Sequence, residues 1–533
     1  MRRRTFLALA GASAASCALP RPRVATPFDC VIRGATLFDG LGHPGQELDL
    51  AVAGDTIAAI GRIDPGQART RIDARGLALA PGFIDIHTHS DGAILEYPDD
   101  ESRVFQGVTT EVTGNCGGSA APGEAWCDVA AYFRALEQRR VATHQVLLVG
   151  QGTLRRAVAR NENRALTRGE LARCEQLLEE ALDAGAAGLS TGLEYVPGRY
   201  TPTAEIVALA RALARRGKLY ASHVRNEEAG LCEAIDEALR IGRESGARVE
   251  ISHLKACGKP NWPRQAQAIA SIEAARASGL DVFADAYPYT AYSTGLSIFL
   301  DDATREGGAD EVLARFADPA QRARIRAGLA PRLASDPGAP ELVVIASTSA
   351  ADKSVVGRDL ASIAEQRGLA PEEALLVLLE EARTEVSFVG HAMSEENVRA
   401  VLRLPWVMIG SDGYAMAPRG KALEKQPHPR SYGTFARVLQ RYVREERVLA
   451  LPEALHKMCG MPARQLGLAG RGTLALGHKA DLVLFDPQKV REESSFATPQ
   501  RLASGFTHVF VDGQAVIADS RATGARPGRA LRL

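Results

Sequence analysis

The chain is 533 residues long, and its 64 Lys and Arg residues balance 64 Asp and Glu residues, so the formal net charge is zero. A balanced chain lacks the basic surface that nucleic acids and anionic membranes attract, so we expect a small-molecule substrate. With 46% apolar residues and 50 glycines the composition suits a compact α/β enzyme. No apolar run outside the extreme N-terminus reaches the roughly 18 residues that span a bilayer.

Residues 1–27 are predicted to be an export signal and linker. Arg2, Arg3 and Arg4 precede a modestly apolar run that ends at Leu19, which is typical of an exported protein. The stretch 3–7 resembles a twin-arginine signal, so we expect a bacterial protein that is exported in folded form, to the periplasm. Cys17 is a poor lipidation site, because an aliphatic residue larger than alanine is expected three positions before it. We therefore expect no stable membrane association unless Cys17 is lipidated.

Both ends of the remaining chain are rich in short strands. Apolar, β-branched runs lie at 30–32, 48–52, 56–61, 480–486 and 507–516. Neither end has enough strands to bury its faces alone. We therefore predict that residues 28–80 and 467–533 join in one small β-sandwich.

Residues 81–466 alternate between strand-like and helical runs. The strand-like runs lie at 83–88, 109–112, 146–149, 188–190, 219–222, 249–252, 282–285 and 407–410. Helical runs such as 168–184 and 204–216 separate them. About eight such repeats favour an α/β fold of the (β/α)8 TIM-like barrel type over an open sheet. The segment of about 293–342 interrupts this rhythm with dispersed charges and helical runs, so we predict an inserted lid over the site.

Two histidines follow the first strand-like run of this region. His87 and His89 are two residues apart, and in a strand such residues project from the same face. Neutral imidazoles held side by side are good ligands for zinc and other divalent metals. A lone His-x-His would still be better explained by surface or packed histidines, so its position at a strand end matters.

Other chemically active residues also follow strand-like runs. They are Cys116 between glycines, His223, His253 and Asp412. In a barrel, catalytic side chains sit at the C-terminal ends of the strands. Alone, Cys116 would be better explained as a buried free thiol, since eight cysteines in so long a chain form no disulfide framework. Together with His87 and His89, however, these residues form a constellation that packing would not produce by chance.

These motifs resemble a known family. The stretch 81–91, Gly-Asn-Cys-Gly at 114–117, Ser-His-Leu-Lys at 252–255 and Ser-Asp-Gly at 411–413 look like the amidohydrolase superfamily, and within it the D-aminoacylase (N-acyl-D-amino-acid deacylase) family. The resemblance covers about residues 28–486. It implies a metal-carrying (β/α)8 barrel, a small β-sandwich built from both termini, and an inserted lid. Many other amidohydrolases hold two metals with a carboxylated lysine, whereas this family uses a cysteine.

The resemblance also implies roles for individual residues. It assigns a tightly bound zinc to Cys116, His223 and His253, and a weaker second metal position to His87, His89 and Asp412. Three protein ligands leave a zinc position for water, whose pKa falls to about 7 there. Asp412 would take a proton from that water and return it to the departing amine.

For the substrate, the resemblance points to Lys255, Tyr287, Ser293 and Arg430 around a free α-carboxylate. Arg430 would grip the carboxylate with two parallel hydrogen bonds, whereas Lys255 adds a point charge. The alternative for Arg430 is a solvated surface arginine, and the longer segment 417–426 before it departs from the family pattern. Residues 194–198 are expected to shape the acyl pocket. His391 also follows an apolar run, and there a structural histidine is the safer interpretation.

The sequence thus predicts an exported, zinc-dependent hydrolase that cleaves N-acyl-D-amino acids to a carboxylate and a free D-amino acid. One alternative is hydrolysis of a cyclic amide of the hydantoin or dihydropyrimidine type, or of a dipeptide with a D residue. A second alternative is a non-catalytic relative that uses the barrel for binding. The intact residues Cys116, His223, His253 and Asp412 argue against that second alternative. The preference for D over L substrates rests on the resemblance alone.

Overall fold

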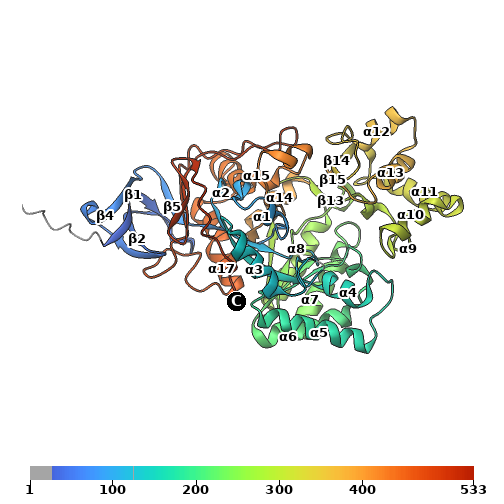
Figure 1. The fold of residues 1–533 in the computed structure, drawn as a ribbon, viewed down its shortest axis with the longest axis horizontal. Helices are drawn as coiled ribbons and strands as arrows, with labels where there is room; N and C mark the ends of the chain where they lie inside the picture. Colours follow the sequence, from blue (N-terminus) through green and yellow to red (C-terminus); the bar gives the residue numbers. More distant parts are fainter. Residues whose placement is uncertain (1–26, 124) are drawn as a thin grey trace, which may run out of the picture.

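The computed structural model describes residues 27–123 and 125–533. The predicted signal and Cys17 therefore lie outside the described residues. In the described ranges, no helix is both long and apolar enough to cross a membrane. Figure 1 shows three parts in a row: a β-rich part built from the two chain ends, a central α/β part, and a third part at the opposite end.

The central part is a parallel eight-stranded barrel. In sheet order its strands are β16 (Val407–Ile409), β12 (Val282–Ala286), β11 (Arg248–Ile251), β10 (Leu219–His223), β9 (Gly188–Gly192), β8 (His144–Gly150), β7 (Val108–Thr113) and β6 (Phe83–Asp85). A parallel bridge between Thr88 and Gly413 joins β6 and β16 just beyond their ends. All eight predicted runs are barrel strands, so the predicted fold class is confirmed.

Helices cover the outside of the barrel. The longer ones are α3 (Val129–Arg139), α4 (Gln151–Ala159), α5 (Arg168–Asp183), α6 (Thr203–Arg216), α7 (Leu231–Ser245), α8 (Arg264–Ala277) and α14 (Glu395–Arg403). Local sequence sets their ends: Thr167 and Glu170 form a capping box at the start of α5. Gly217, at φ +63°, ends α6 in the left-handed conformation that glycine adopts without strain. The two helices whose ranges were predicted from the sequence, 168–184 and 204–216, are confirmed.

Shorter elements complete the barrel. They are α1 (Ala93–Glu96), α2 (Glu101–Val104), η2 (Gly198–Tyr200), η3 (Lys259–Asn261), η6 (Gly420–Glu424), α15 (Arg430–Arg437), the π-helical η7 (Val438–Glu445), α16 (Leu451–Met458) and α17 (Gly460–Leu466). The segment 417–426 that departs from the family pattern contains η6. Its last residue, Gln426, donates its backbone N–H to Ala346 O at 2.8 Å, which fastens this segment to the third part of the molecule.

The two chain ends form one nine-stranded sheet. Its members are β1 (Phe28–Leu37), β2 (Gln46–Ala53), β3 (Thr56–Gly61), β4 (Ala68–Asp73), β5 (Ala78–Pro81), β17 (Leu482–Phe485), β18 (Phe506–Val511), β19 (Gln514–Ala518) and β20 (Arg521–Ala522), with η1 (Pro65–Gln67) before β4. Strand β5 joins the two ends, since it pairs with β1 on one side and with β17 on the other. Ile32, Leu50, Leu482 and Phe510 share one core, so the predicted union of both termini is confirmed.

The last residues of the chain leave this sheet. Gln145 of β8 forms a bridge with Ala530, and Leu533 donates its N–H to Gly185 O at 3.1 Å. The predicted C-terminal part of the sandwich, 467–533, thus ends in a tail against the barrel. Tertiary pairing decides this placement, and no periodicity in the tail indicates it.

The third part, residues 292–390, is an insertion between β12 and β16, and we refer to it as the lid. It contains β13 (Tyr292–Gly295), η4 (Leu296–Phe299), α9 (Asp302–Arg305), α10 (Ala309–Ala317), α11 (Pro319–Leu333), η5 (Pro340–Leu342), β14 (Val343–Thr348), α12 (Leu360–Arg367), α13 (Pro371–Glu381) and β15 (Val386–Gly390). Its sheet has the order β13-β15-β14, and its helices share a core with that sheet. The lid extends well past the predicted range of about 293–342. The prediction stopped short because the second half of the lid has the helix-then-strand pattern of a barrel unit.

Phe83 fastens the barrel to the sheet of the chain ends. Its ring is fully buried against Phe435, Phe485 and Phe506, with centroid distances of 5.7, 6.3 and 6.3 Å. Phe83→Ala is expected to lower the free energy of unfolding by about 3–5 kcal/mol. Removing the ring leaves a cavity between the barrel and the sheet, and the surrounding side chains cannot move in to fill it. Urea unfolding checks this, with the exposed Leu423→Ala as control. A loss below about 1 kcal/mol would contradict the central role of Phe83.

Candidate metal centre

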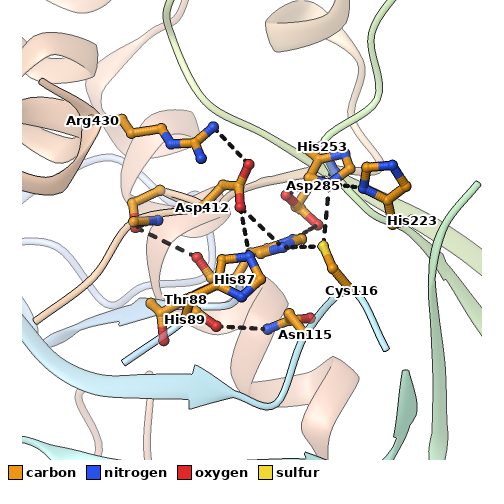
Figure 2. A network of polar contacts seen from close by, with 12 residues as sticks. His87, Thr88, His89, Asn115, Cys116, His223, His253, Asp285, Asp412 and Arg430 are labelled. Atoms are coloured by element: carbon orange, nitrogen blue, oxygen red, sulfur yellow. Dashed lines mark hydrogen bonds and ion pairs between the residues drawn. The ribbon is translucent and has the colours of Figure 1, made fainter. Parts of the chain in front are cut away.

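The C-terminal ends of the barrel strands bring the predicted ligands together. His87 and His89 follow β6, Cys116 follows β7, and His223 ends β10. His253 follows β11, and Asp412 follows β16. Figure 2 shows these six side chains converging on one volume. Apart from His89 and Cys116, which are partly exposed, each of them is buried.

His253 contacts both Cys116 and His223, and it also belongs to a group with His87, Cys116 and Asp412 whose ligand atoms all lie within 4.8 Å of one another. Cys116 Sγ lies 3.4 Å from His253 Nε2, and His253 Nε2 lies 2.9 Å from His223 Nδ1. A tetrahedral zinc separates its S and N ligands by about 3.6 Å and two N ligands by about 3.4 Å. Each of these two observed distances thus needs to lengthen by only about half an ångström or less. A thiolate with two imidazoles is a donor set that zinc favours, so these residues fit the ion.

His87, His89 and Asp412 form a further contact group. Asp412 Oδ1 lies 2.9 Å from His89 Nε2 and 3.5 Å from His87 Nε2. His87 Nε2 also lies 3.3 Å from Cys116 Sγ, so the cysteine borders both groups. The bridge between β6 and β16 sets this geometry, because Asp412 N donates to His87 O at 2.8 Å. The structure therefore brings together all six residues of the predicted metal and acid–base set.

Three of these residues hold a backbone conformation that is unfavourable for residues with a Cβ atom. Cys116, His253 and Asp412 have φ angles of +52°, +36° and +53°. Such residues cost of order 1 kcal/mol or more each and cluster at functional sites. The turn also requires Gly117, at φ +76°, because a Cβ atom there would lie 2.5 Å from Gly192 N. Local strain is therefore concentrated at the strand ends that carry the side chains.

The two acidic groups at the centre are held in their charged forms. Burial raises the pKa of the Cys116 thiol, but His87 and His253 outweigh burial and hold that pKa well below its usual value. Burial likewise raises the pKa of Asp412, and Arg430 with His89 more than reverses this. A thiolate that can bind metal and a carboxylate that can accept a proton thus coexist at neutral pH.

The four predicted substrate residues line a cavity of about 790 Å³ that reaches the metal centre. They are Lys255, Tyr287, Ser293 and Arg430. The Lys255 ammonium and the Arg430 guanidinium lie 5.7 and 4.9 Å from the centroid of the Tyr287 ring. Arg430 is 3% exposed, which excludes a solvated surface arginine.

Two donors in this cavity lack hydrogen-bond partners. Tyr287 Oη and Arg430 Nη1 are buried, and neither makes a hydrogen bond within the described part of the chain. Arg430 Nη1 lies 2.7 Å from Asp412 Oδ2 as an ion pair, without hydrogen-bond alignment. A buried donor without a partner costs about 1–3 kcal/mol. The wall of the cavity is therefore built to donate to a ligand atom.

Lys255 is paired within the protein. Its Nζ lies 2.6 Å from Glu227 Oε1 and 2.9 Å from His253 Nδ1. For Ser293 the structure gives a role to the backbone, since its carbonyl accepts from Arg430 Nη2 at 3.2 Å.

Among the other predicted residues, Tyr195, Val196 and Pro197 line the cavity, as expected for residues that shape a pocket. His391 contacts Phe496 edge-to-face at a centroid distance of 4.8 Å and does not line the cavity, consistent with a structural role.

Sequence reasoning missed three carboxylates that touch the histidines. Asp285 Oδ2 lies 3.1 Å from His87 Nδ1, Glu227 Oε1 lies 3.1 Å from His253 Nδ1, and Glu194 Oε2 lies 3.2 Å from His223 Nε2. Asp285 is the last residue but one of the buried strand β12, and a carboxylate near a strand end is a signal that the sequence already contains. Glu194 and Glu227 lie in loops after strands and carry no pattern that separates them from surface glutamates.

A further cluster combines His144, Asp481 and Asp512 at the opposite end of β8. Here the Arg471 guanidinium occupies the position that a metal ion would take. Its Nη1 lies 2.9 Å from His144 Nε2 and contacts Asp481, and its Nη2 lies 2.8 Å from Asp512 Oδ1. This cluster is therefore an ion-pair network that ties the barrel to the sheet of the chain ends.

Comparisons with known proteins agree with the geometry. A family model described as "Amidohydrolase family" matches residues 70–517. D-aminoacylase from Alcaligenes xylosoxydans xylosoxydans is 38% identical over 522 residues, covering 95% of this chain and 98% of that protein. The crystal structure of N-acyl-D-glutamate deacylase from Bordetella bronchiseptica, with zinc and a phosphonate that mimics the tetrahedral intermediate, is similar at TM-score 0.82 and 35% identity, covering 95% and 100% of the two chains. A D-aminoacylase structure described with a binuclear metal centre matches at TM-score 0.82 and 36% identity, with the same coverage.

Proposed function

This chain belongs to the amidohydrolase family, and from that premise we propose that it hydrolyses the amide bond of N-acyl-D-amino acids to a carboxylate and a free D-amino acid. The observation that carries the proposal is the junction of two features. His253 contacts both Cys116 and His223, which gives a zinc-type donor set, and the adjoining cavity presents the unpartnered Tyr287 hydroxyl beside the Arg430 guanidinium. An N-acyl amino acid offers an amide to the first feature and a carboxylate to the second.

We assign the tightly held zinc to Cys116, His223 and His253, and a weaker second position to His87, His89 and Asp412. Zinc supplies Lewis-acid chemistry there, polarising the amide carbonyl and acidifying water. The protein holds the ligand side chains in place through the strand ends and through the carboxylates that touch the outer ring nitrogens. This arrangement limits the rearrangement that binding of the ion requires.

Asp412 moves the proton in this reaction. Its pKa is held well below the usual value, so the carboxylate is ionised and can accept a proton from the attacking water. The same proton then passes to the amide nitrogen, which leaves as an amine, and the acyl group is released as a carboxylic acid that loses its own proton at neutral pH. Arg430 holds Asp412 Oδ2 while His89 holds Asp412 Oδ1, so both carboxylate oxygens are fixed in position.

The α-carboxylate of the substrate fits beside Arg430, Tyr287 and Lys255. Tyr287 Oη donates to it without breaking a hydrogen bond, because it has none in the described chain, and the Arg430 guanidinium adds charge while its Nη1 stays paired with Asp412. Lys255 keeps its pairing with Glu227 and contributes charge. A cyclic amide without a carboxylate would leave the buried Tyr287 hydroxyl unsatisfied, which disfavours that alternative.

Tyr287→Phe is expected to lower kcat/KM for N-acyl-D-amino acids by about 10–100-fold, mainly by raising KM, since a hydrogen bond to a charged group contributes about 1.5–3 kcal/mol. Steady-state kinetics measure this. Tyr289→Phe is the matched control, because Tyr289 Oη donates to Glu492 at 2.7 Å and does not line the cavity. Equal effects of the two variants would remove Tyr287 from the carboxylate site.

The proposed function is tested with the zinc-loaded mature chain on N-acetyl-D- and N-acetyl-L-amino acids, with hydantoin and dihydropyrimidine alongside. Amine release from D substrates alone is the expected result. Turnover of the cyclic amides without turnover of the linear ones would replace the proposal with the cyclic-amide alternative. Zinc binding without turnover of any substrate would favour the non-catalytic alternative.

We also propose export in folded form to the periplasm, supported by Arg3, Arg4 and the apolar run after them. Fusing residues 1–27 to a folded reporter in a bacterium tests this. The reporter is expected in the periplasm. The double substitution Arg3→Lys and Arg4→Lys is expected to keep the reporter in the cytoplasm. Unchanged export of the doubly substituted fusion would contradict a twin-arginine route. A membrane-bound fusion that Cys17→Ala releases would instead show lipidation.

A further inference from the structure

We propose that Glu194 is a positioning residue, which orients His223 toward the metal, and that the lid holds Glu194 in place through Arg305. This inference rests on the zinc site of the proposed function and adds a group outside the ligand set. The contact that motivates it joins Glu194 Oε2 and His223 Nε2 at 3.2 Å, with the histidine side chain 3% exposed.

The contact decides which ring nitrogen of His223 faces the metal. A carboxylate beside Nε2 accepts the N–H of that nitrogen, which leaves Nδ1 as the nitrogen that faces the metal position. That Nδ1 is the atom 2.9 Å from His253 Nε2. His253 uses its nitrogens in the opposite sense, because its Nδ1 faces Glu227 and Lys255. Each histidine thus has a carboxylate on its outer nitrogen and its inner nitrogen beside the other ring.

Glu194 acts through His223 and not on the substrate. It does not line the cavity, whereas the next residue, Tyr195, does. The Tyr195 ring also packs against the His223 ring at a centroid distance of 4.6 Å and an interplanar angle of 52°, so two consecutive residues contact that imidazole. The loop after β9 therefore acts as a support for one ligand.

This loop is fastened to the lid. Arg305 of α9 donates from Nη1 to the Glu194 carbonyl at 3.1 Å and pairs with Asp302 at 2.9 Å. Asp302 in turn accepts from Arg199 at 2.7 Å. Thr294 of β13 contacts Tyr195 Oη at 3.2 Å. The backbone on which the Glu194 side chain is mounted is thus fixed by lid residues, which connects the insertion to the metal centre.

The first experiment measures zinc affinity by competition with a chelator for the whole chain and for Glu194→Ala and Glu194→Gln. Loss of such an outer partner typically weakens metal binding about 10–100-fold. Glu194→Ala is expected to show this loss, and Glu194→Gln a smaller one, because the amide oxygen still accepts from Nε2. Cobalt(II) is the second probe: the visible spectrum of the cobalt-loaded variants should change in the same order.

Glu228→Gln is the matched control. Glu228 lies close enough to Glu194 for their charges to interact, and no histidine contact is found for it in the described residues, so it tests the effect of charge alone. Zinc affinity of the Glu228 variant should equal that of the unmodified chain. If both Glu194 variants bind zinc as tightly as the unmodified chain, or if Glu228→Gln weakens binding equally, the inference is overturned.

Arg305→Met tests the lid connection. It should weaken zinc binding by less than Glu194→Ala does, since the carboxylate remains but its backbone is less firmly held. Arg332→Met is the control, because Arg332 donates to Phe299 O inside the lid and does not reach the loop after β9. Equal effects of the two arginine variants would remove the lid from the proposal. If the unmodified chain binds no zinc, the proposed function fails first, and this outcome is distinct from tight binding by every variant.

Discussion

Asp412→Asn is expected to lower kcat by about 10²–10⁴-fold, the range that general acid–base catalysis contributes. An amide nitrogen leaves very poorly unless it is protonated, and Asn can neither accept the proton of water nor return it. Zinc held by Cys116, His223 and His253 should stay, since Asp412 contacts the neighbouring group around His89. Kinetics on an N-acetyl-D-amino acid, together with zinc content per chain, measure both parts of the prediction.

Asp281→Asn is the matched control, because this half-exposed carboxylate pairs with Arg248 at the opposite end of the barrel. It should leave kcat unchanged. If Asp412→Asn keeps more than about a tenth of the original kcat while holding zinc, another group moves the proton. If it loses zinc as well, Asp412 belongs to the tight metal site and the division between the two groups is wrong.

Cys116→Ala is expected to remove the tightly bound zinc and turnover together. Loss of an outer partner already costs about 10–100-fold in metal affinity, so loss of the thiolate itself should cost more than about 100-fold. Metal analysis after dialysis, with an activity assay on the same sample, measures this. Readdition of zinc at high concentration should restore turnover only in part, because two imidazoles do not complete the donor set.

Cys174→Ala provides the control for removing a buried thiol. Cys174 packs into the barrel core on α5, far from the metal ligands in the fold, and burial raises its pKa to about 12. This variant should be less stable, yet hold zinc and turn over substrate normally. Full zinc content in Cys116→Ala would show that the metal is held by other residues.

Much of the fold follows from local sequence. Each barrel strand is a short apolar run bounded by turn residues, and each leaves a chemically active residue or a glycine at its end, so the eight runs were predictable. The lid was harder, because its strands β14 and β15 and the helices α12 and α13 have the same local pattern as a barrel unit. Only pairing of β15 with β13 and β14 separates them from the barrel, and such pairing is long-range.

The candidate site, like the fold, contains some residues that the sequence predicts and others that only the structure identifies. His87, Cys116, His253 and Asp412 were predictable, because their residue types are rare and stand at strand ends. Glu194 was not singled out as a histidine partner, although the loop that carries it was expected to shape the pocket. A glutamate in a loop is ordinary until the fold places its carboxylate against an imidazole. The unpartnered donors of the cavity were equally invisible in the sequence, since a missing partner is a property of the packed structure alone.

Strand β5 has a consequence for how the protein is made. It pairs with β1 on one side and with β17 on the other, and it runs through Gly82 into β6, the strand that precedes His87 and His89. During synthesis, β17 emerges about 400 residues after β5, so until then β5 has an open edge of the kind that promotes aggregation. Synthesis of β17 therefore closes this edge only when most of the chain has been made, whereas β6 already has β7 as its neighbour.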